Sequence, residues 1–131
     1  MSDVEIEFAE GKTDWQADEM LAGRYRLASP DARDVDRLEF SVLWYTSGKG
    51  DEDLEVHLHE ESRADSPDWS NPGDWRSFSC PLPQTPLSYD GVLVKIHWCV
   101  RVRYFAGSKQ ILGEASFRLG EVAQGQKVEK S

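Results

Sequence analysis

Cysteine is scarce in this chain, which has only Cys80 and Cys99 among its 131 residues. Neither belongs to a CxxC pair or to a cysteine–histidine spacing that binds zinc, so a disulfide framework and a zinc ribbon are both excluded. Counting in steps of two places Cys80 on an apolar strand face and Cys99 on a polar one. We therefore predict two free thiols.

Positive charge is outweighed as well. The 15 lysine and arginine residues are set against 24 aspartate and glutamate residues, which gives a formal net charge of -9. Such a protein repels phosphate backbones, and no dense basic cluster offsets the repulsion. The composition argues against nucleic acid as a partner.

Long apolar runs are missing too. No stretch approaches the ~20 apolar residues that a membrane-spanning helix needs. The chain begins with the acidic MSDVEIEFAEG, whereas a signal peptide begins with basic and then apolar residues. The sequence predicts a cytoplasmic protein with no transmembrane segment.

Catalytic motifs are also absent from the sequence. It contains no GxSxG, HExxH or dinucleotide fingerprint, and Gly48-Lys49-Gly50 lacks the spaced leading glycine and the following Ser or Thr of a phosphate loop. His97 and Cys99 share a predicted strand face, but a catalytic thiol also needs an orienting third group and an oxyanion hole. We expect a protein that is not an enzyme and that uses no cofactor.

The sequence is rich in period-two alternation of apolar and polar side chains, the pattern of strands with one buried and one wet face. Together with weaker apolar runs, it predicts seven strands, at residues 4–8, 21–28, 37–45, 54–59, 75–80, 92–104 and 111–119. In the longest run every second residue from Val92 to Tyr104 is apolar, and a strand of that length should bend or bulge. The fold class is all-β: a two-sheet immunoglobulin-like or arrestin-like β-sandwich of about seven antiparallel strands.

This sandwich domain is expected to cover residues 1–120, followed by a flexible tail at 121–131 that has no periodicity. Trp44 and Trp98 stand at the apolar positions of their strands and are expected in the core. Residues 61–74 are rich in Pro, Asn, Gly and Asp, which predicts a long surface loop. Thr13 and Gln16 resemble a capping box, so a short helical turn at residues 17–22 is the alternative to a strand connection there.

From Leu38 to Leu119 the pattern resembles the arrestin-like superfamily, and two segments carry most of the resemblance. The main one runs from Phe78 to Val92, with Leu82-Pro83, Pro86, Ser88-Tyr89 and Gly91 leading into the long alternating strand. Residues 18–25, DEMLAGRY, are similar to an early strand of that superfamily. The resemblance implies one arrestin-like half, a sandwich fold and non-catalytic binding of other proteins. The paired lysines that sense phosphate in arrestins are absent here, so receptor binding is not implied.

Histidines form the one pattern in the sequence that resembles a metal site. His57 and His59 lie two apart on a predicted strand, which would place both rings on one face, and His97 occupies a similar outward position. No fourth ligand has a fixed place in the pattern, and histidines without one are more often bystanders on an exposed strand face. These three residues are therefore weak candidates, and we assign no metal.

Basic and aromatic residues supply the candidates for partner binding. Lys95, Arg101 and Arg103 form a basic stripe that, together with Arg118 on the next strand, would suit an acidic partner. Pairing with carboxylates on neighbouring strands is the alternative. The tryptophans that border the 61–74 loop, Trp69 and Trp75, suit a protein hot spot or sugar stacking, or else cap the sandwich end.

The function that follows is a non-enzymatic protein-interaction or scaffolding module with a protein partner. The alternative is a small-ligand binder, which would take carbohydrate through the loop-edge tryptophans or metal through the strand histidines. Open sheet edges also make a homodimer possible.

Overall fold

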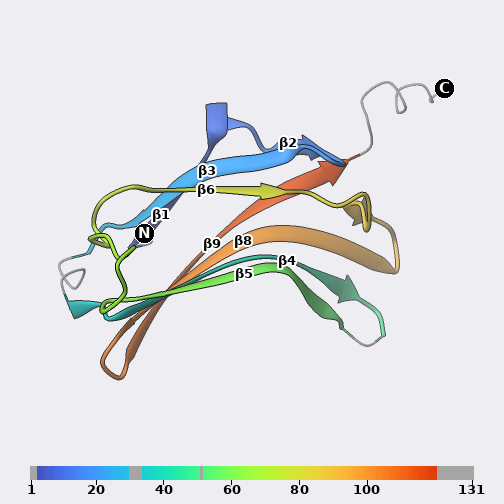
Figure 1. The fold of residues 1–131 in the computed structure, drawn as a ribbon. Coiled ribbons are helices and arrows are strands. Elements are labelled where there is room, and N and C mark those ends of the chain that lie inside the picture. Colours follow the sequence, from blue (N-terminus) through green and yellow to red (C-terminus); the bar gives the residue numbers. More distant parts are fainter. Residues whose placement is uncertain (1–2, 30–33, 51, 121–131) are drawn as a thin grey trace.

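The computed structural model describes residues 3–29, 34–50 and 52–120, which form two packed β-sheets (Figure 1). In chain order the elements are β1 (Val4–Phe8), the 3-10 turn η1 (Ala9–Gly11), β2 (Asp14–Gln16), β3 (Met20–Leu27), β4 (Arg37–Gly48), β5 (Leu54–Arg63), β6 (Arg76–Pro81), β7 (Tyr89–Asp90), β8 (Val94–Ala106) and β9 (Lys109–Gly120). No helix in these ranges has the length and apolar character needed to cross a bilayer.

The smaller sheet has the strand order β1-β3-β6, and the larger has the order β2-β9-β8-β4-β5, with β7 paired to β8. The two-sheet, all-β prediction is confirmed, and a strand is present at each of the seven predicted places. Prediction missed β2 and β7, which have three and two residues. It also missed that β2 runs parallel to β9, whereas the other strand pairs are antiparallel within the described ranges.

The core lies between the sheets and is rich in aromatic rings. Tyr25 stacks on Phe40 with ring centroids 5.3 Å apart, and Phe40 lies 4.9 Å from Phe78. Trp98 is 1% exposed, as predicted for a core residue, while Trp44 is only partly buried at the margin of the core. Ring pairs at such distances stabilise a fold beyond the apolar area they bury.

Strand β5 departs from the predicted alternation. Its register with β4 shifts between Val42 and Leu43, so that His57 is the extra residue of a β-bulge. The bulge reverses which face the following side chains occupy. Leu58 packs toward the core, whereas Leu54 and Val56 are 51% and 50% exposed. Strict alternation over the predicted strand at 54–59 would place these three residues on one apolar face, and this is wrong because of the bulge.

Cys99 is a second correction, because it is buried although it points to the outer face of the larger sheet. Only 2% of it is exposed, and its cross-strand neighbour Leu43 is 1% exposed. The stacked rings of Tyr45 and His97 lie on one side of it along the strands, and Arg101 with its carboxylate partner lies on the other. Long flanking side chains thus shield a short one on a face that is otherwise wet.

The segment before β3 is not helical. The chain turns after β2, with Asp18 at a φ of 67°, and β3 begins at Met20, so the helical alternative for residues 17–22 is wrong. The predicted 61–74 loop begins later than expected, since β5 continues to Arg63. The loop is tied to β3, where the Leu27 N–H donates to the carbonyl oxygen of Pro72 at 2.8 Å. The predicted tail at 121–131 lies outside the described residues.

Candidate functional site

At one end of the sandwich, on the right in Figure 1, the larger sheet forks. Strand β8 pairs with β9 only as far as Trp98 opposite Phe117. Beyond that point β8 pairs with β7, through Ile96 opposite Tyr89, while β9 turns aside to pair with β2. Among the described residues, no strand fills the space between the two arms of the fork.

The segment just before β7 holds the two arms in place. The Ser88 N–H donates to the carbonyl oxygen of Leu119 at 2.7 Å, and the Leu119 N–H donates to the Ser88 hydroxyl at 2.9 Å. The Trp98 indole N–H donates to the carbonyl oxygen of Pro86 at 2.7 Å. A buried core side chain and a strand end therefore position this segment, which pre-organises the fork.

Two adjoining hollows occupy the fork, and we call them together the fork groove. The first has a volume of about 690 Å³ and is lined by Asp14, Trp15, Gln16, Pro86, Leu87, Ser88, Tyr89, Ile96, Arg118 and Gly120. The second has a volume of about 320 Å³ and is lined by Ser88, Tyr89, Asp90, Lys95, Ile96, His97, Trp98, Ser116, Phe117 and Arg118. The first hollow is within the size range of typical ligand sites.

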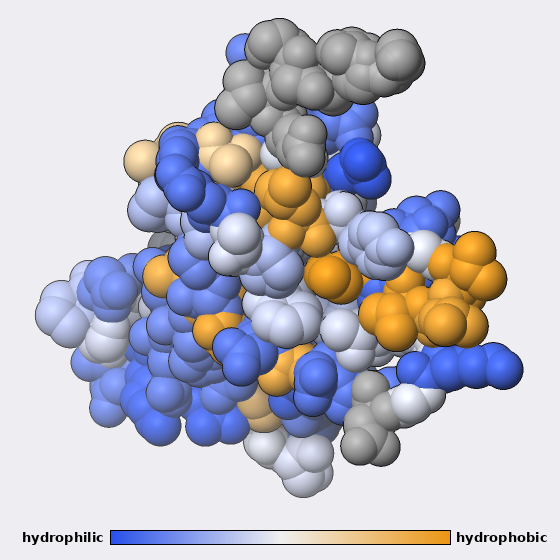
Figure 2. All heavy atoms as spheres, turned by 90° about the vertical axis from the view of Figure 1, so that its right-hand side faces the viewer, coloured by the Kyte–Doolittle hydropathy of each residue, from blue (hydrophilic) through white to orange (hydrophobic). Residues whose placement is uncertain are grey.

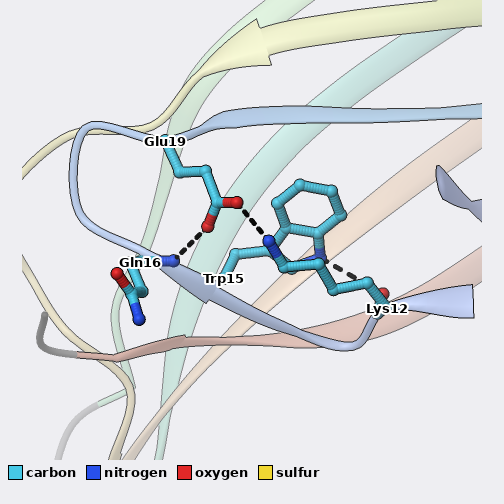
Figure 3. A network of polar contacts seen from close by, with 4 residues as sticks. All are labelled: Lys12, Trp15, Gln16 and Glu19. Atoms are coloured by element: carbon cyan, nitrogen blue, oxygen red, sulfur yellow. Dashed lines mark hydrogen bonds and ion pairs between the residues drawn. The ribbon is translucent and has the colours of Figure 1, made fainter. Parts of the chain in front are cut away.

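A compact polar network fixes β2, which forms one wall of the groove (Figure 3). The Glu19 carboxylate accepts hydrogen bonds from the Lys12 ammonium and, at 2.9 Å, from the Gln16 N–H. The ammonium also lies 4.3 Å from the centre of the Trp15 ring, whose indole N–H donates to the Lys12 carbonyl oxygen. The hydrogen bond from Lys12 is the main reason that the pKa of Glu19 is lowered.

Beside the groove, the turn between β7 and β8 exposes apolar side chains, which we call the hairpin tip. Its members are Tyr89, Val92, Leu93 and Val94, with exposed fractions of 57%, 100%, 61% and 37%. Figure 2 shows apolar surface gathered at this end of the molecule. The sequence pattern had assigned Val92 to the apolar face of a strand, and this was wrong because β8 begins only at Val94.

Backbone hydrogen bonds hold the hairpin tip in its exposed position. The Lys49 N–H donates to the Leu93 carbonyl oxygen at 2.8 Å, and the Gly91 N–H donates to that of Val94 at 3.1 Å. The close approach requires glycine at position 48, where φ is +123° and a Cβ atom would lie 2.2 Å from the Leu93 oxygen. The exposure of these side chains is therefore built into the turn.

The charges in the groove are unevenly paired. Lys95 forms an ion pair with Asp90 at 2.7 Å, and this contact is the main cause of the lowered pKa of Asp90, with smaller effects from His97 and Arg118. Arg118 lines both hollows. In the ranges that the structure describes, no carboxylate lies within 4.0 Å of the Arg118 guanidinium.

The predicted basic stripe is divided by the fold. Lys95 lies in the groove, whereas Arg101 forms a 2.5 Å ion pair with Glu114 directly across on β9. Arg103 lies farther along β8, between Glu39 and a leucine on the neighbouring strands. Lys95 and Arg101 thus pair with carboxylates on neighbouring strands, as the alternative to a basic stripe for an acidic partner predicted.

The three histidines do not come together. His57 lies on the core side, with Nε2 2.8 Å from the Pro81 carbonyl oxygen and its ring 6.0 Å from that of Trp98. His59 lies on the outer face, where Nδ1 is 2.8 Å from a serine hydroxyl, and His97 contacts a different serine. The expected shared face of His57 and His59 is wrong, because the bulge separates them. Among the described residues, no group of three His, Cys, Asp or Glu side chains is placed to hold a metal ion.

Both candidate tryptophans lie outside the lining of the fork groove. Trp69 is partly buried and packs against the core. Trp75 lies beneath the guanidinium groups of Arg24 and Arg26, at 4.1 and 4.5 Å from the ring centre. Each of these arginines also pairs with a glutamate of β1, so the Trp75 ring belongs to a charged ladder on the smaller sheet.

Sequence reasoning missed the hairpin tip and the fork groove. One signal was available, since three consecutive apolar residues follow the Asp90-Gly91 turn, and alternation places only every second one on the core side. The place where β9 leaves β8 has no comparable signal, because it depends on the pairing of β9 with the short β2.

No family model and no curated protein matches this chain. Solved structures do resemble it. One is the superoxide reductase (neelaredoxin) from Ignicoccus hospitalis, with a TM-score of 0.52 and 10% identity over 89% of this chain and 80% of that one. A second structure of that reductase, in which one glutamate is replaced by alanine, gives 0.51 and 11% identity over 91% of this chain and 81% of that one.

Spo0M, the sporulation control protein from Bacillus subtilis, gives a TM-score of 0.52 and 10% identity. The match covers 91% of this chain and 50% of Spo0M, so the chain spans half the length of that protein. At such identities the likeness concerns the fold alone. The fold is an immunoglobulin-like or arrestin-like β-sandwich.

Proposed function

We propose that this domain is a non-enzymatic protein-interaction module of the arrestin-like kind, which binds a partner protein through its forked end. The observation that carries the proposal is the hairpin tip, four neighbouring apolar side chains held out into solvent beside a groove. Scattered exposed apolar residues are ordinary, but a contiguous group next to a concavity is typical of an interface.

The energetics favour binding through this surface. Burying apolar area contributes roughly 25 cal/mol per Å², and Val92 is fully exposed, so all of its area is available to a partner. The backbone bonds of Lys49 and Gly91 already fix the turn. A rigid tip loses less conformational entropy on association than a flexible loop would.

The state of the thiols supports a non-enzymatic role. Cys80 and Cys99 are 1% and 2% exposed, and burial is the main cause that raises the pKa of each to about 11. At neutral pH both are protonated, and a protonated, buried thiol is a poor nucleophile.

The test is a pull-down with the tagged full chain from lysate of the source organism. A tip variant carries Val92→Ser and Leu93→Ser, and a matched control carries Val56→Ser and Leu112→Ser, two apolar positions with 50% and 48% exposure elsewhere. We expect the wild type and the control to capture the same partner and the tip variant to lose it, with equal thermal stability for all three. Equal capture by the tip variant would refute the proposal.

A further inference from the structure

We propose that the fork groove binds a short acidic segment of the partner protein, in which an apolar side chain stands next to a carboxylate that pairs with Arg118. This inference rests on the proposed function and names the chemistry of the segment that the forked end recognises.

Arg118 differs from the neighbouring basic residues because no carboxylate among the described residues pairs with it. On the same sheet Lys95 has Asp90 at 2.7 Å, and Arg101 has Glu114 at 2.5 Å. In the part of the chain that the structure describes, the Arg118 guanidinium has no carboxylate within 4.0 Å, and the residue is exposed. A guanidinium offers a planar fork of donors that fits a carboxylate with two parallel hydrogen bonds.

The charges that line the second hollow favour an acidic ligand. In a chain of net charge -9, acidic ligands are repelled by most of the surface. The second hollow differs, because Lys95 and Arg118 line it against the single carboxylate of Asp90, and His97 lies beside them. Its charged groups sum to about +1 with neutral histidine, so a carboxylate is attracted there.

The first hollow supplies apolar contacts beside its polar groups. Leu87, Tyr89 and Ile96 contribute to it, and its one carboxylate is that of Asp14. The two hollows meet at Arg118. A ligand that fills both would therefore place an apolar side chain in the first and a carboxylate in the second.

The test measures the fluorescence anisotropy of labelled peptides with the full chain. The probe is the capped peptide Ac-Gly-Ser-Leu-Glu-Leu-Gly-amide, and its counterpart has Gln in place of Glu. We expect the wild type to bind the Glu peptide at least about tenfold more tightly, a difference of about 1.4 kcal/mol. Arg118→Gln should abolish this preference and Arg118→Lys should keep part of it. The matched control Arg103→Gln, on the same sheet face outside the groove lining, should retain it.

Several results would contradict the acidic-segment assignment. Equal affinity for the two peptides, no binding of either, or an equal loss of preference in Arg103→Gln would overturn the acidic-segment assignment. Sedimentation that shows a dimer disrupted by Arg118→Gln would overturn it too, because the occupant would then be a second copy. If the pull-down still depends on Val92 and Leu93 in those cases, the proposed function stands without this inference. If that dependence is also absent, both fail.

Discussion

His57 Nε2 lies 2.8 Å from the carbonyl oxygen of Pro81, and this contact joins β5, an edge strand of the larger sheet, to β6, an edge strand of the smaller. The ring also lies edge-on to buried Trp98, at 6.0 Å. The bulge in β5 directs His57 toward β6 at the open edge of the sandwich, where the side chain remains exposed. The side chain therefore links the edge strands of the two sheets at the margin of the core.

Replacing His57 should weaken the link between β5 and β6. His57→Ala removes one hydrogen bond and the cover over Trp98, and we expect a loss of about 1 kcal/mol in the free energy of unfolding with greater quenching of tryptophan fluorescence by acrylamide. The matched variant His59→Ala lies on the outer face and should change stability by less than about 0.5 kcal/mol. An equal effect of both variants in urea denaturation would contradict this role.

His57 also shows what the sequence can and cannot predict. Alternation correctly places a strand at residues 54–59, since that pattern follows from the strand itself. The bulge depends on how β5 aligns with β4, a partner distant in sequence, so the alternation does not contain it. For this reason the strand was predicted and the faces of its histidines were not.

At the forked end, too, the sequence pattern predicted the strand but not the contacts between distant segments. The long alternating run predicted β8, yet its start at Val94 is set by the bond from Lys49 to the turn rather than by apolar pattern. Likewise Cys99 lies on the predicted outer face, but its burial depends on neighbouring strands that supply Leu43 and Tyr45. Local patterns predicted the strands, whereas contacts between distant segments determine the site.

Gly23 should tolerate no side chain. A Cβ atom there would lie 2.3 Å from the carbonyl oxygen of Glu7 and 2.7 Å from the ring of Phe78. Because one of these contacts is backbone, we expect Gly23→Ala to cost about 1–3 kcal/mol, as overpacking does in cores. Gly107→Ala serves as a comparison, because no atom lies within 4 Å of its added Cβ and any cost arises from its φ of +62° alone. Thermal melting that ranks Gly107→Ala as the more damaging change would contradict the packing role of Gly23.

The buried thiols should make stability fall at high pH. Burial is the main cause that raises the pKa of Cys80 and Cys99 from 9.0 to about 11, so the folded state holds protons that the unfolded state releases. The stability that the two protonated thiols contribute to the folded state is complete below pH 9 and is lost as the pH rises from about 9 to about 11. A Cys80→Ala, Cys99→Ala double variant should lose less stability over that window, by about 2 kcal/mol per thiol. Denaturation curves with equal pH dependence would contradict this expectation.

The network around Glu19 should hold β2 in place. The hydrogen bond from Lys12 is the main reason that the pKa of Glu19 is lowered. The stability that the ionised carboxylate contributes is therefore present above the ordinary pKa of 4.5. It is lost as the pH falls through the lowered pKa. Glu19→Gln should therefore speed hydrogen exchange of the Gln16 amide, which donates to this carboxylate. The amide of Val100, in the centre of the larger sheet, should keep its protection. Unchanged exchange at Gln16 would show that β2 does not need the network.

The most direct test of the forked end as the contact surface is photo-cross-linking from position 92. The photoreactive residue p-benzoylphenylalanine replaces Val92, which is fully exposed, and in a parallel protein it replaces Leu112, which is 48% exposed on β9. Irradiation in lysate of the source organism should give one discrete adduct from position 92 and none from position 112. An adduct from position 112 alone, or the same adducts from both positions, would contradict binding through the hairpin tip.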